Sequence, residues 1–266
     1  MHRMETEAWR MDIAIVTGAS SGLGGRFVEL LDGQERLDEI WVIARRRERL
    51  EALGARVRTP LRVLPLDLTD RAAVRELDRL LGELKPSVRV LINAAGFGRI
   101  GAWDDVTLAD CESMIDLNCR AAVAVTRVAL EHMGEGARIM QICSTAAFQP
   151  FPYLSVYAAS KAFLYRYTRA LRVELKPRRI KVTAVCPYWI KDTEFIAVAQ
   201  RTRDSSCIRH FPLASREDSV ARRALADSRL GLAVSTPGPV CTLHRIAAKA
   251  LPAGVTMAAW ELLRRL

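Results

Sequence analysis

The sequence lacks any long uninterrupted run of apolar residues, and its first residues lack the features of a secretion signal. No apolar run approaches the ~18 residues that a membrane-spanning helix needs, so we expect no integral membrane segment. The polar stretch 1–10 has no apolar core of the kind found in signal peptides. We expect residues 1–10 to be a disordered N-terminal extension, and Met11 is a second candidate for the start of the chain.

The sequence also lacks the spacing of cysteines and histidines that marks a zinc site. It contains six cysteines and four histidines, but no Cys-x-x-Cys pair and no Cys/His cluster at the spacing of metal ligands. Cys143 and Cys186 lie in apolar, strand-like runs, where a free cysteine usually behaves as a small buried hydrophobe. We therefore expect no metal ion, and we expect reduced thiols in a cytoplasmic protein.

The chain carries a large positive charge without a basic cluster to match. It has 40 Lys and Arg against 30 Asp and Glu, a formal net charge of +10. The basic residues are spread along the chain, and Arg45-Arg46-Arg47 is the only run of three. A basic balance without a patch says little about partners, so we expect no nucleic acid ligand. Half of the residues are hydrophobic, which is enough for a large core.

Short apolar runs alternate with amphipathic segments as far as Cys186. The runs are rich in Val, Ile and Leu on both faces, which is typical of strands in a covered parallel sheet. They predict strands over Ile13–Thr17, Ile40–Ala44, Leu61–Leu66, Val88–Asn93, Arg138–Cys143 and Ile180–Cys186. The segments between them predict helices over Leu23–Leu31, Arg47–Leu53, Arg71–Leu84, Leu108–Met133 and Val156–Lys176. This alternation indicates a Rossmann-like α/β fold, a doubly wound parallel sheet of about seven strands with helices on both faces.

The alternation weakens after Cys186. Residues 187–215 mix aromatic, charged and small residues, and we interpret them as a substrate loop. Residues 236–266 form an atypical end that Pro252 divides into two helices. The later elements are predicted at Thr193–Arg201, Glu217–Ser228, Leu243–Ala250 and Val255–Leu266 (helices) and near Leu230–Val234 (strand). Since there is no internal repeat and no low-complexity linker, we expect residues 11–266 to form a single domain.

A glycine-rich turn joins the first predicted strand to the first predicted helix. Its sequence is Thr17-Gly18-Ala19-Ser20-Ser21-Gly22-Leu23-Gly24. Such a turn lets the backbone approach a pyrophosphate closely, and the helix N-terminus offers free N–H groups and a positive dipole end to the anion. A glycine-rich turn alone is a weak signal, but its position between a strand and a helix indicates a dinucleotide site.

The residues after the second predicted strand favour NADP(H) over NAD(H). An NAD-specific site has an acidic side chain there, which accepts hydrogen bonds from the adenosine ribose. Here Ala44 leads into three arginines, which can hold a 2′-phosphate in a forked contact. We predict Arg45 as the first ligand of that phosphate and Arg46 as the second. The alternative is a solvated helix start, although a cationic first turn opposes the helix dipole.

A tyrosine and a lysine four residues apart open the fifth predicted helix. That spacing places Tyr157 and Lys161 on one helix face. A nearby cation favours phenolate and would lower the tyrosine pKa from its ordinary value of about 10. Tyr157 could then act as a general acid in reduction and a general base in oxidation. Ser144 follows the fifth strand, at the edge where doubly wound sheets bind ligands, and its hydroxyl can donate to a carbonyl oxygen.

These motifs together resemble the short-chain dehydrogenase/reductase family over about residues 12–195. The resemblance implies an NADP(H)-dependent oxidoreductase that interconverts a ketone and a secondary alcohol. It implies Ser144, Tyr157, Lys161 and Asn118 as catalytic residues, with Asn118 holding a water that relays protons to Lys161. Members of this family are commonly homodimers or homotetramers, so we expect a homo-oligomer.

The resemblance also assigns residues to the cofactor. They are Gly18, Ser20, Ser21, Gly22, Leu23, Gly24, Arg45, Arg46, Asp67, Leu68, Asn93, Ala94, Ala95, Gly96, Tyr157, Lys161, Pro187, Ile190 and Thr193. Within this set, Asp67 is expected near the adenine amino group, with a turn or helix-capping role as its alternative. Asn93 is expected to tie neighbouring strands together, and Lys161 to hold the nicotinamide ribose.

Two segments depart from the family pattern. Ala94 replaces the second asparagine of the usual Asn-Asn-Ala-Gly, and Tyr188 replaces the glycine that usually follows Pro187. Thr193 is displaced by one residue from the usual threonine. Ile190 and Thr193 are still expected near the nicotinamide carboxamide, in a loop of unusual geometry.

Aromatic residues near strand ends and in the substrate loop suggest the substrate. They are Phe97, Phe148, Phe151, Tyr153, Tyr188, Trp189 and Phe195. Such a set can line an apolar pocket, which favours a bulky hydrophobic ketone or alcohol such as a hydroxysteroid or bile acid. The alternative is that several of them fill the core. Two other functions stay open: a 3-oxoacyl-thioester (acyl-carrier-protein) reductase and a non-catalytic NADP-binding regulator.

Overall fold

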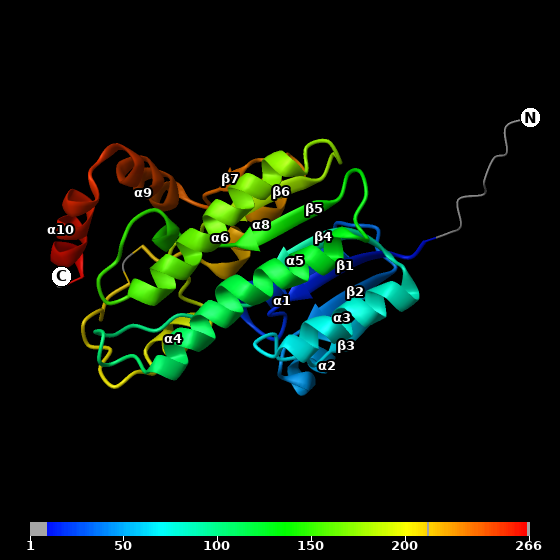
Figure 1. The fold of residues 1–266 in the computed structure, drawn as a ribbon, viewed down its shortest axis with the longest axis horizontal. Coiled ribbons are helices and arrows are strands. Elements are labelled where there is room, and N and C mark those ends of the chain that lie inside the picture. Colours follow the sequence, from blue (N-terminus) through cyan, green and yellow to red (C-terminus); the bar gives the residue numbers. More distant parts are fainter. Residues whose placement is uncertain (1–9, 212, 265–266) are drawn as a thin grey trace, which may run out of the picture.

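A sheet of seven parallel strands forms the middle layer of the molecule, and helices cover both of its faces (Figure 1). The computed structural model describes residues 10–211 and 213–264. Nearly all of the predicted disordered extension, and the last two residues of the final predicted helix, lie outside this part. The strand order is β3-β2-β1-β4-β5-β6-β7, which confirms the predicted single-domain, doubly wound fold.

The strands agree closely with the apolar runs of the sequence. They are β1 (Asp12–Thr17), β2 (Glu39–Ile43), β3 (Leu61–Leu64), β4 (Ser87–Asn93), β5 (Arg138–Ile142), β6 (Lys181–Val185) and β7 (Val234–Ser235). Alternate residues of β1 face opposite sides of the sheet. Ile13 and Ile15 belong to the core on one side, and Ala14 and Val16 belong to the core on the other. Burial on both faces explains why the strands are apolar throughout.

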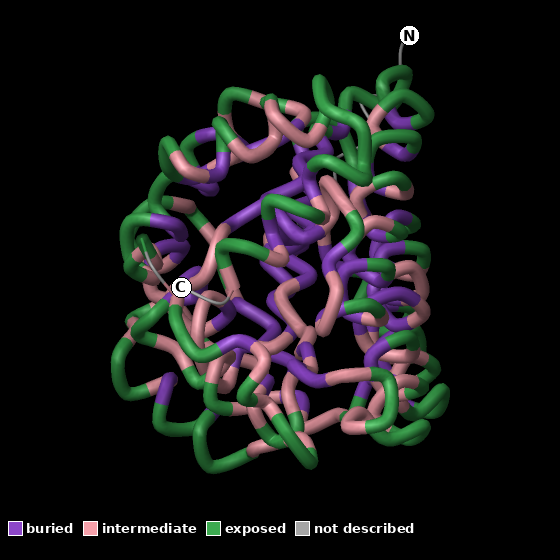
Figure 2. Tube along the Cα trace, turned by 90° about the vertical axis from the view of Figure 1, so that its left-hand side faces the viewer, coloured by how far each residue is buried: buried purple, intermediate pink, exposed green. Residues whose placement is uncertain are grey.

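The helices divide between these two cores. They are α1 (Gly22–Asp32), α2 (Arg47–Gly54), α3 (Arg71–Leu84), α4 (Leu108–Ile115), α5 (Ala122–Leu130), α6 (Ser155–Glu174), α7 (Phe195–Ala199), α8 (Glu217–Arg229), α9 (Pro239–Ala250) and α10 (Ala253–Leu263). Helices α3, α5 and α6 supply buried residues to the first core, and α1, α2 and α8 supply the second. In Figure 2 the buried residues lie in the middle of the molecule and the exposed residues mainly on its outer side. None of the helices in the described residues is long and apolar enough to span a membrane.

The predicted helix over Leu108–Met133 is not continuous. A π-helical segment, η1 (Asp116–Ala121), separates α4 from α5, and a short 3₁₀ turn, η2 (Thr145–Ala147), follows β5. Single π turns inside helices are rare and often occur at functional sites. Here the π turn contains Asn118, whose side chain is completely buried.

The C-terminal helices α9 and α10 lie beyond the carboxyl ends of β5 and β6, at the red end of the chain in Figure 1. Helix α9 begins at Pro239, four residues earlier than predicted, because proline suits the first turn of a helix. Trp260 of α10 packs edge-on against Phe151 at 4.9 Å and donates a hydrogen bond from Nε1 to the Pro152 carbonyl. The last helix thereby closes onto the end of the sheet where the site lies.

The turn between β1 and α1 tolerates no side chain at two glycines. A Cβ on Gly24 would lie 2.2 Å from the Gly18 carbonyl oxygen, and one on Gly18, where φ is +69°, would lie 2.7 Å from the Ala95 amide nitrogen. These are backbone atoms that cannot rotate away.

We therefore expect Gly24→Ala to lower the free energy of unfolding by about 1–3 kcal/mol, as overpacking does. Gly82→Ala is the control, because Gly82 lies in α3 with no atom within 4 Å of its added Cβ. That change should stabilise the protein by up to about 1 kcal/mol through helix propensity. Urea unfolding measures both, and equal effects of the two substitutions would contradict the close approach.

Candidate active site

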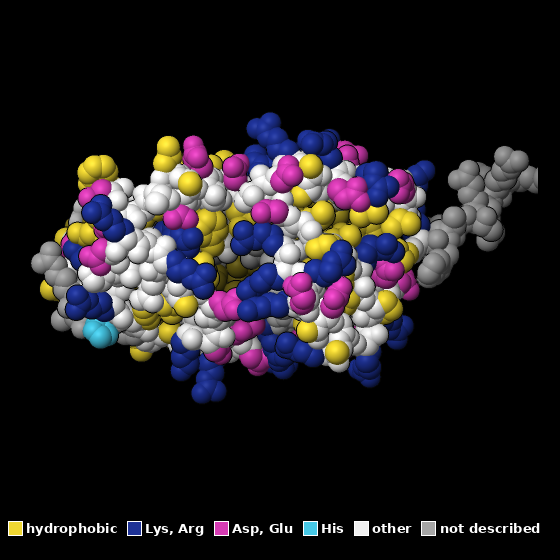
Figure 3. Space-filling model, turned by 90° about the horizontal axis from the view of Figure 1, so that it is seen from below, with side chains coloured by type: hydrophobic (Ala, Val, Ile, Leu, Met, Phe, Trp, Pro, Cys, Tyr) yellow, Lys and Arg dark blue, Asp and Glu magenta, His cyan; other side chains and the backbone are white. Residues whose placement is uncertain are grey.

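A large pocket opens along the carboxyl ends of β1, β4, β5 and β6. Its volume is about 1070 Å³, and Figure 3 shows a hollow with a hydrophobic floor and basic side chains around its rim. With the exception of two asparagines, every site residue predicted from the sequence lines this pocket. The crevice lies where the strand order changes direction between β1 and β4, which is the expected ligand position in an open α/β sheet.

The glycine-rich turn forms one end of the pocket. Ser21 precedes α1 and makes no side-chain hydrogen bond to the N–H groups of its first turn. Those N–H groups and the positive end of the helix dipole therefore lie at the pocket wall without a capping side chain. Gly22 has a φ of +55°, and its α-carbon faces the loop that carries Thr193. The turn has the free N–H groups and the open backbone that a pyrophosphate needs.

Arg46 lies across this turn. Its guanidinium donates hydrogen bonds to the Ser20 and Ser21 hydroxyls, with a shortest distance of 2.8 Å. It also pairs with Glu194 at 2.9 Å, and Arg49 pairs with the other oxygen of Glu194 at 2.7 Å. These two guanidiniums hold the pKa of the Glu194 carboxyl below its usual value. Neither Arg49 nor Glu194 was predicted, and since Glu194 is 148 residues from Arg46, no local pattern could have indicated this pair.

Arg45 and Asp67 lie further out in the pocket. Arg45 keeps 75% of its side-chain surface exposed and approaches Asp67 only to 3.9 Å. Asp67 accepts hydrogen bonds from the backbone N–H and the hydroxyl of Thr69. The alternative interpretation of Asp67 as a turn residue therefore describes its present contacts, although it still lines the pocket. Arg46 is held in place by more hydrogen bonds than Arg45, and it is therefore the better placed of the two to bind an anion.

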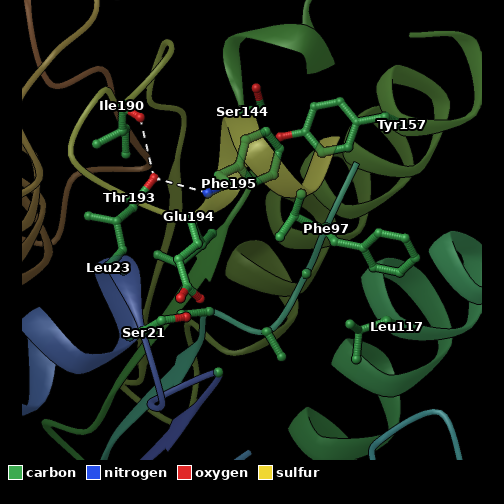
Figure 4. Close-up of a pocket in the computed structure, with 18 of the residues that line it drawn as sticks. Ser21, Leu23, Phe97, Leu117, Ser144, Tyr157, Ile190, Thr193, Glu194 and Phe195 are labelled. Carbon is green, nitrogen blue, oxygen red and sulfur yellow. Dashed lines mark hydrogen bonds between the residues drawn. The ribbon is translucent and has the colours of Figure 1, made fainter. Parts of the chain in front are cut away.

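The hydroxyls of Ser144 and Tyr157 lie near each other in the pocket (Figure 4), close enough for Ser144 to act on the pKa of the phenol. Ser144 follows β5, and its Oγ also accepts a hydrogen bond from the Ala146 N–H, which fixes the side chain at the start of η2. Burial raises the pKa of Tyr157 well above its ordinary value, and the hydrogen bond from Ser144 opposes this shift. The direction is opposite to that expected from the neighbouring Lys161, because loss of hydration outweighs the effect of the cation.

Lys161 is buried directly behind Tyr157. Its Nζ lies 5.9 Å from the centre of the Tyr157 ring and donates a 2.7 Å hydrogen bond to the Ile142 carbonyl. Burial lowers the pKa of this ammonium. Gly96 gives the lysine room, since a Cβ there would lie 3.2 Å from Nζ and 2.8 Å from Oδ1 of Asn118.

The hydrogen bonds of the two predicted asparagines, Asn118 and Asn93, connect elements of the fold to one another. Asn118 accepts from the Phe97 N–H and donates to the Phe97 carbonyl and to Ser160. It thereby joins the π turn to the segment after β4 and to α6. Asn93 of β4 and Gln141 of the neighbouring strand β5 both donate to the Thr126 hydroxyl, so Asn93 links the two strands through α5. It donates to Thr126 and to the Ala122 carbonyl, and so connects β4 to α5, and it does not line the pocket. Asn93 as a cofactor ligand stays a prediction, and its amide points toward α5.

The loop after β6 lies against the glycine-rich turn, with Thr193 next to Gly22. Thr193 donates from its hydroxyl to the Ile190 carbonyl and accepts from the Phe195 N–H, as Figure 4 shows. Tyr188, which replaces the usual glycine, does not adopt a positive φ. The loop therefore accommodates a tyrosine without left-handed backbone.

The far end of the pocket is lined by aromatic residues from three parts of the chain. Phe97, Phe151, Tyr188, Trp189 and Phe195 line it as predicted. Phe148 and Tyr153 do not: Phe148 packs against Tyr165 and His244, and Tyr153 lies under the Arg264 guanidinium.

The pocket also has residues that were not predicted, among them Arg99, Arg201 and Trp260. Trp260 comes from the C-terminal helix α10, more than 100 residues along the chain from Phe151 and Pro152, which it contacts. Among residues 10–211 and 213–264, no group of three His, Cys, Asp or Glu side chains could hold a metal ion.

Comparison with known proteins agrees with this geometry. The model of the short chain dehydrogenase family matches residues 12–204. Sulfoacetaldehyde reductase 2 of Chromohalobacter salexigens is 37% identical over 198 residues, which are 70% of this chain and 75% of that protein. An NADP-dependent 3-hydroxy acid dehydrogenase of Salmonella typhi is 34% identical over 193 residues, again 70% and 75% of the two chains.

Two solved structures superimpose over nearly the whole chain. A short-chain dehydrogenase from Sphingobium yanoikuyae in complex with NADPH has a TM-score of 0.76 at 27% identity and covers 96% of both chains. A bulky-bulky ketone specific alcohol dehydrogenase from Comamonas testosteroni has a TM-score of 0.72 at 25% identity, covering 97% of this chain and 96% of that one. The chain belongs to the short-chain dehydrogenase family, a family of oxidoreductases.

The raised pKa of Tyr157 predicts how the two reaction directions depend on pH. Below its pKa the phenol keeps the proton that reduction requires, so kcat/KM for ketone reduction should stay level through neutral pH and fall only under strongly alkaline conditions. Alcohol oxidation needs phenolate and should rise with pH over the same range.

Steady-state pH profiles in both directions measure this. Ser144→Ala removes the hydrogen bond that opposes the shift, so it should move the alkaline limbs to still higher pH. A reductive profile that already falls between about pH 6 and pH 8 would contradict the assignment.

Proposed function

We propose that the protein is an NADP(H)-dependent oxidoreductase that interconverts a ketone and a secondary alcohol. The observation that carries this proposal is that the hydroxyls of Ser144 and Tyr157 lie in one pocket with the glycine-rich turn, with Lys161 buried behind the phenol. A non-catalytic regulator would not need this complete set. The reduced state of the cysteines, all of them free, supports a cytoplasmic location.

The pocket fits a phosphorylated dinucleotide. We propose that the turn Gly18–Gly24 holds the pyrophosphate, that Ala94, Ala95 and Gly96 border the adenosine ribose, and that Lys161 binds the nicotinamide ribose. Pro187, Ile190 and Thr193 would contact the carboxamide, and Asp67 and Leu68 the adenine. Arg46, with Arg45, would hold the 2′-phosphate. The NADPH complex of the Sphingobium enzyme and the NADP dependence of the Salmonella enzyme support this choice.

The residues of the chain act on the carbonyl oxygen. NADPH supplies the hydride when it is bound. Tyr157 gives its proton to the carbonyl oxygen as negative charge develops there, and Ser144 donates a hydrogen bond to the same oxygen. Lys161 favours the phenolate that remains, and a water held by Asn118 would return the proton. In oxidation, Tyr157 takes the proton from the alcohol.

The substrate that we propose is a bulky hydrophobic carbonyl compound, such as an oxosteroid or a bile acid derivative. The aromatic wall of the pocket supports this, as does the similarity to the bulky ketone alcohol dehydrogenase. We assign selection of the substrate to residues 187–215 and to the C-terminal segment 236–266, which includes Trp260. A 3-oxoacyl thioester is the alternative substrate, and a panel of both kinds with NADPH distinguishes them.

We also propose a homodimer or homotetramer. Exposed apolar side chains on α4 and α6, namely Leu108, Ile115, Phe163 and Val173, support an interface on that face. Sedimentation at several protein concentrations measures the assembly state.

The function is tested by Tyr157→Phe. Loss of the phenol should lower kcat for ketone reduction by at least about 100-fold, the usual size of acid–base catalysis. The dissociation constant for NADPH, measured by fluorescence titration, should change little. Tyr165→Phe on the same helix is the control, because Tyr165 lies outside the pocket. Unchanged turnover in Tyr157→Phe would exclude the mechanism.

The choice of cofactor is tested at Arg46. Arg46→Ala should weaken NADPH binding about 10- to 100-fold, the effect of losing charge-assisted hydrogen bonds, and leave NADH binding nearly unchanged. Arg47→Ala is the control, because Arg47 pairs with Glu51 on the surface of α2. Glu194→Gln should tighten NADPH binding, since it removes the carboxylate that neutralises Arg46 and Arg49. Equal losses for NADPH and NADH in Arg46→Ala would contradict a phosphate contact.

A further inference from the structure

The substrate end of the pocket carries the charged side chains of Arg99, Arg201 and Asp110 beside its aromatic wall. Arg99 follows β4 and has 15% of its side-chain surface exposed. Its guanidinium lies over the Phe97 ring, 4.9 Å from the ring centre, and donates a 2.6 Å hydrogen bond to the Val198 carbonyl. The ring on one side and the carbonyl on another hold this cation in the wall of the pocket.

The charge of Arg99 is already compensated. Its NH2 group pairs with Asp110 of α4 at 2.9 Å, while the buried Nε has no hydrogen-bond partner in the structure. A buried ion pair of this kind places a guanidinium rigidly but contributes little net charge. Arg99 by itself therefore does not make the pocket positive.

Arg201 does. It follows α7, its side chain is exposed, and it lines the same pocket. Its backbone N–H donates to the Val198 carbonyl, which is the oxygen that Arg99 holds, so the two arginines meet at one residue. Within residues 10–211 and 213–264, no ion pair or side-chain hydrogen bond engages the Arg201 guanidinium. This side of the pocket thus carries two guanidiniums against one carboxylate.

We propose that the substrate carries an acidic group, a carboxylate or a sulfonate, which Arg201 binds at the pocket rim with Arg99 beside it while the carbonyl meets Tyr157. This inference deepens the proposed function and rests on it. A guanidinium binds such an oxyacid through two parallel hydrogen bonds. The aromatic residues between the two ends would hold the apolar body of the substrate. The substrate class is therefore an oxo acid, or the corresponding hydroxy acid, with a hydrophobic middle.

The test compares an oxo acid with its uncharged ester. We choose 4-acetylbenzoate, its methyl ester and 4-acetylbenzenesulfonate, within a series of aryl and aliphatic oxo acids and esters. The wild-type protein should reduce the acids with a higher kcat/KM than the matching esters, and the advantage should shrink as salt screens the arginine. Arg201→Gln should lower kcat/KM for the acids at least about tenfold, mainly through KM, and leave the esters unchanged.

Arg203→Gln is the matched control, because Arg203 is exposed on the same segment and does not line the pocket. Arg201 is preferred to Arg99 for the test because the loss of Arg99 would leave Asp110 unpaired and endanger folding. Esters that are reduced as well as acids, or equal losses for both in Arg201→Gln, would overturn the proposal.

A binding measurement separates this proposal from the proposed function. Trp189 and Trp260 line the pocket, so their fluorescence reports occupancy without turnover. Acids that bind to the wild-type protein and not to Arg201→Gln, in a protein that reduces neither the acids nor the esters, would support the acid site and exclude the reductase function. Reduction of esters without any binding of acids would exclude the acid site alone.

Discussion

The contact between the backbone after β1 and the backbone after β4 is the constraint on which the whole site depends. The Thr17 hydroxyl accepts a hydrogen bond from the Ala95 N–H, and no side chain fits between Gly18 and Ala95. This approach brings the glycine-rich turn against the segment that continues to Phe97 and Arg99. The two ends of the pocket therefore share one wall, and a long ligand can reach from the turn to the aromatic end.

Tyr157 and Lys161 lie where burial disfavours the charged form of each side chain. Burial raises the pKa of Tyr157 and lowers the pKa of Lys161. Because burial disfavours the phenolate of Tyr157 as well as the ammonium of Lys161, the proton stays on the phenol. Such an arrangement suits proton donation to a carbonyl, and Ser144 is the contact that most directly moderates it.

The charges of the pocket follow a consistent pattern. At the cofactor end, Arg46 and Arg49 are paired with Glu194, and at the substrate end Arg99 is paired with Asp110. Each ion pair fixes an arginine in place, and the carboxylate cancels part of the positive electrostatic field of that arginine. Arg201 differs from them because its guanidinium has no such partner in the described part of the chain, and it is the group best able to attract an anion from solution.

The sequence by itself determined the features that short segments encode. Apolar runs such as Ile13–Thr17 set the strands, because strands covered on both faces must be apolar, and the spacing of Tyr157 and Lys161 set their common helix face. Tertiary structure alone decided the features that depend on distant segments. The turn of Asn93 toward α5, the π segment at Asn118, the pairing of Arg46 with Glu194 and the insertion of Trp260 all join residues that lie far apart in the chain. Local periodicity carries no information about such partners, because only the packing of the whole chain brings these distant segments together.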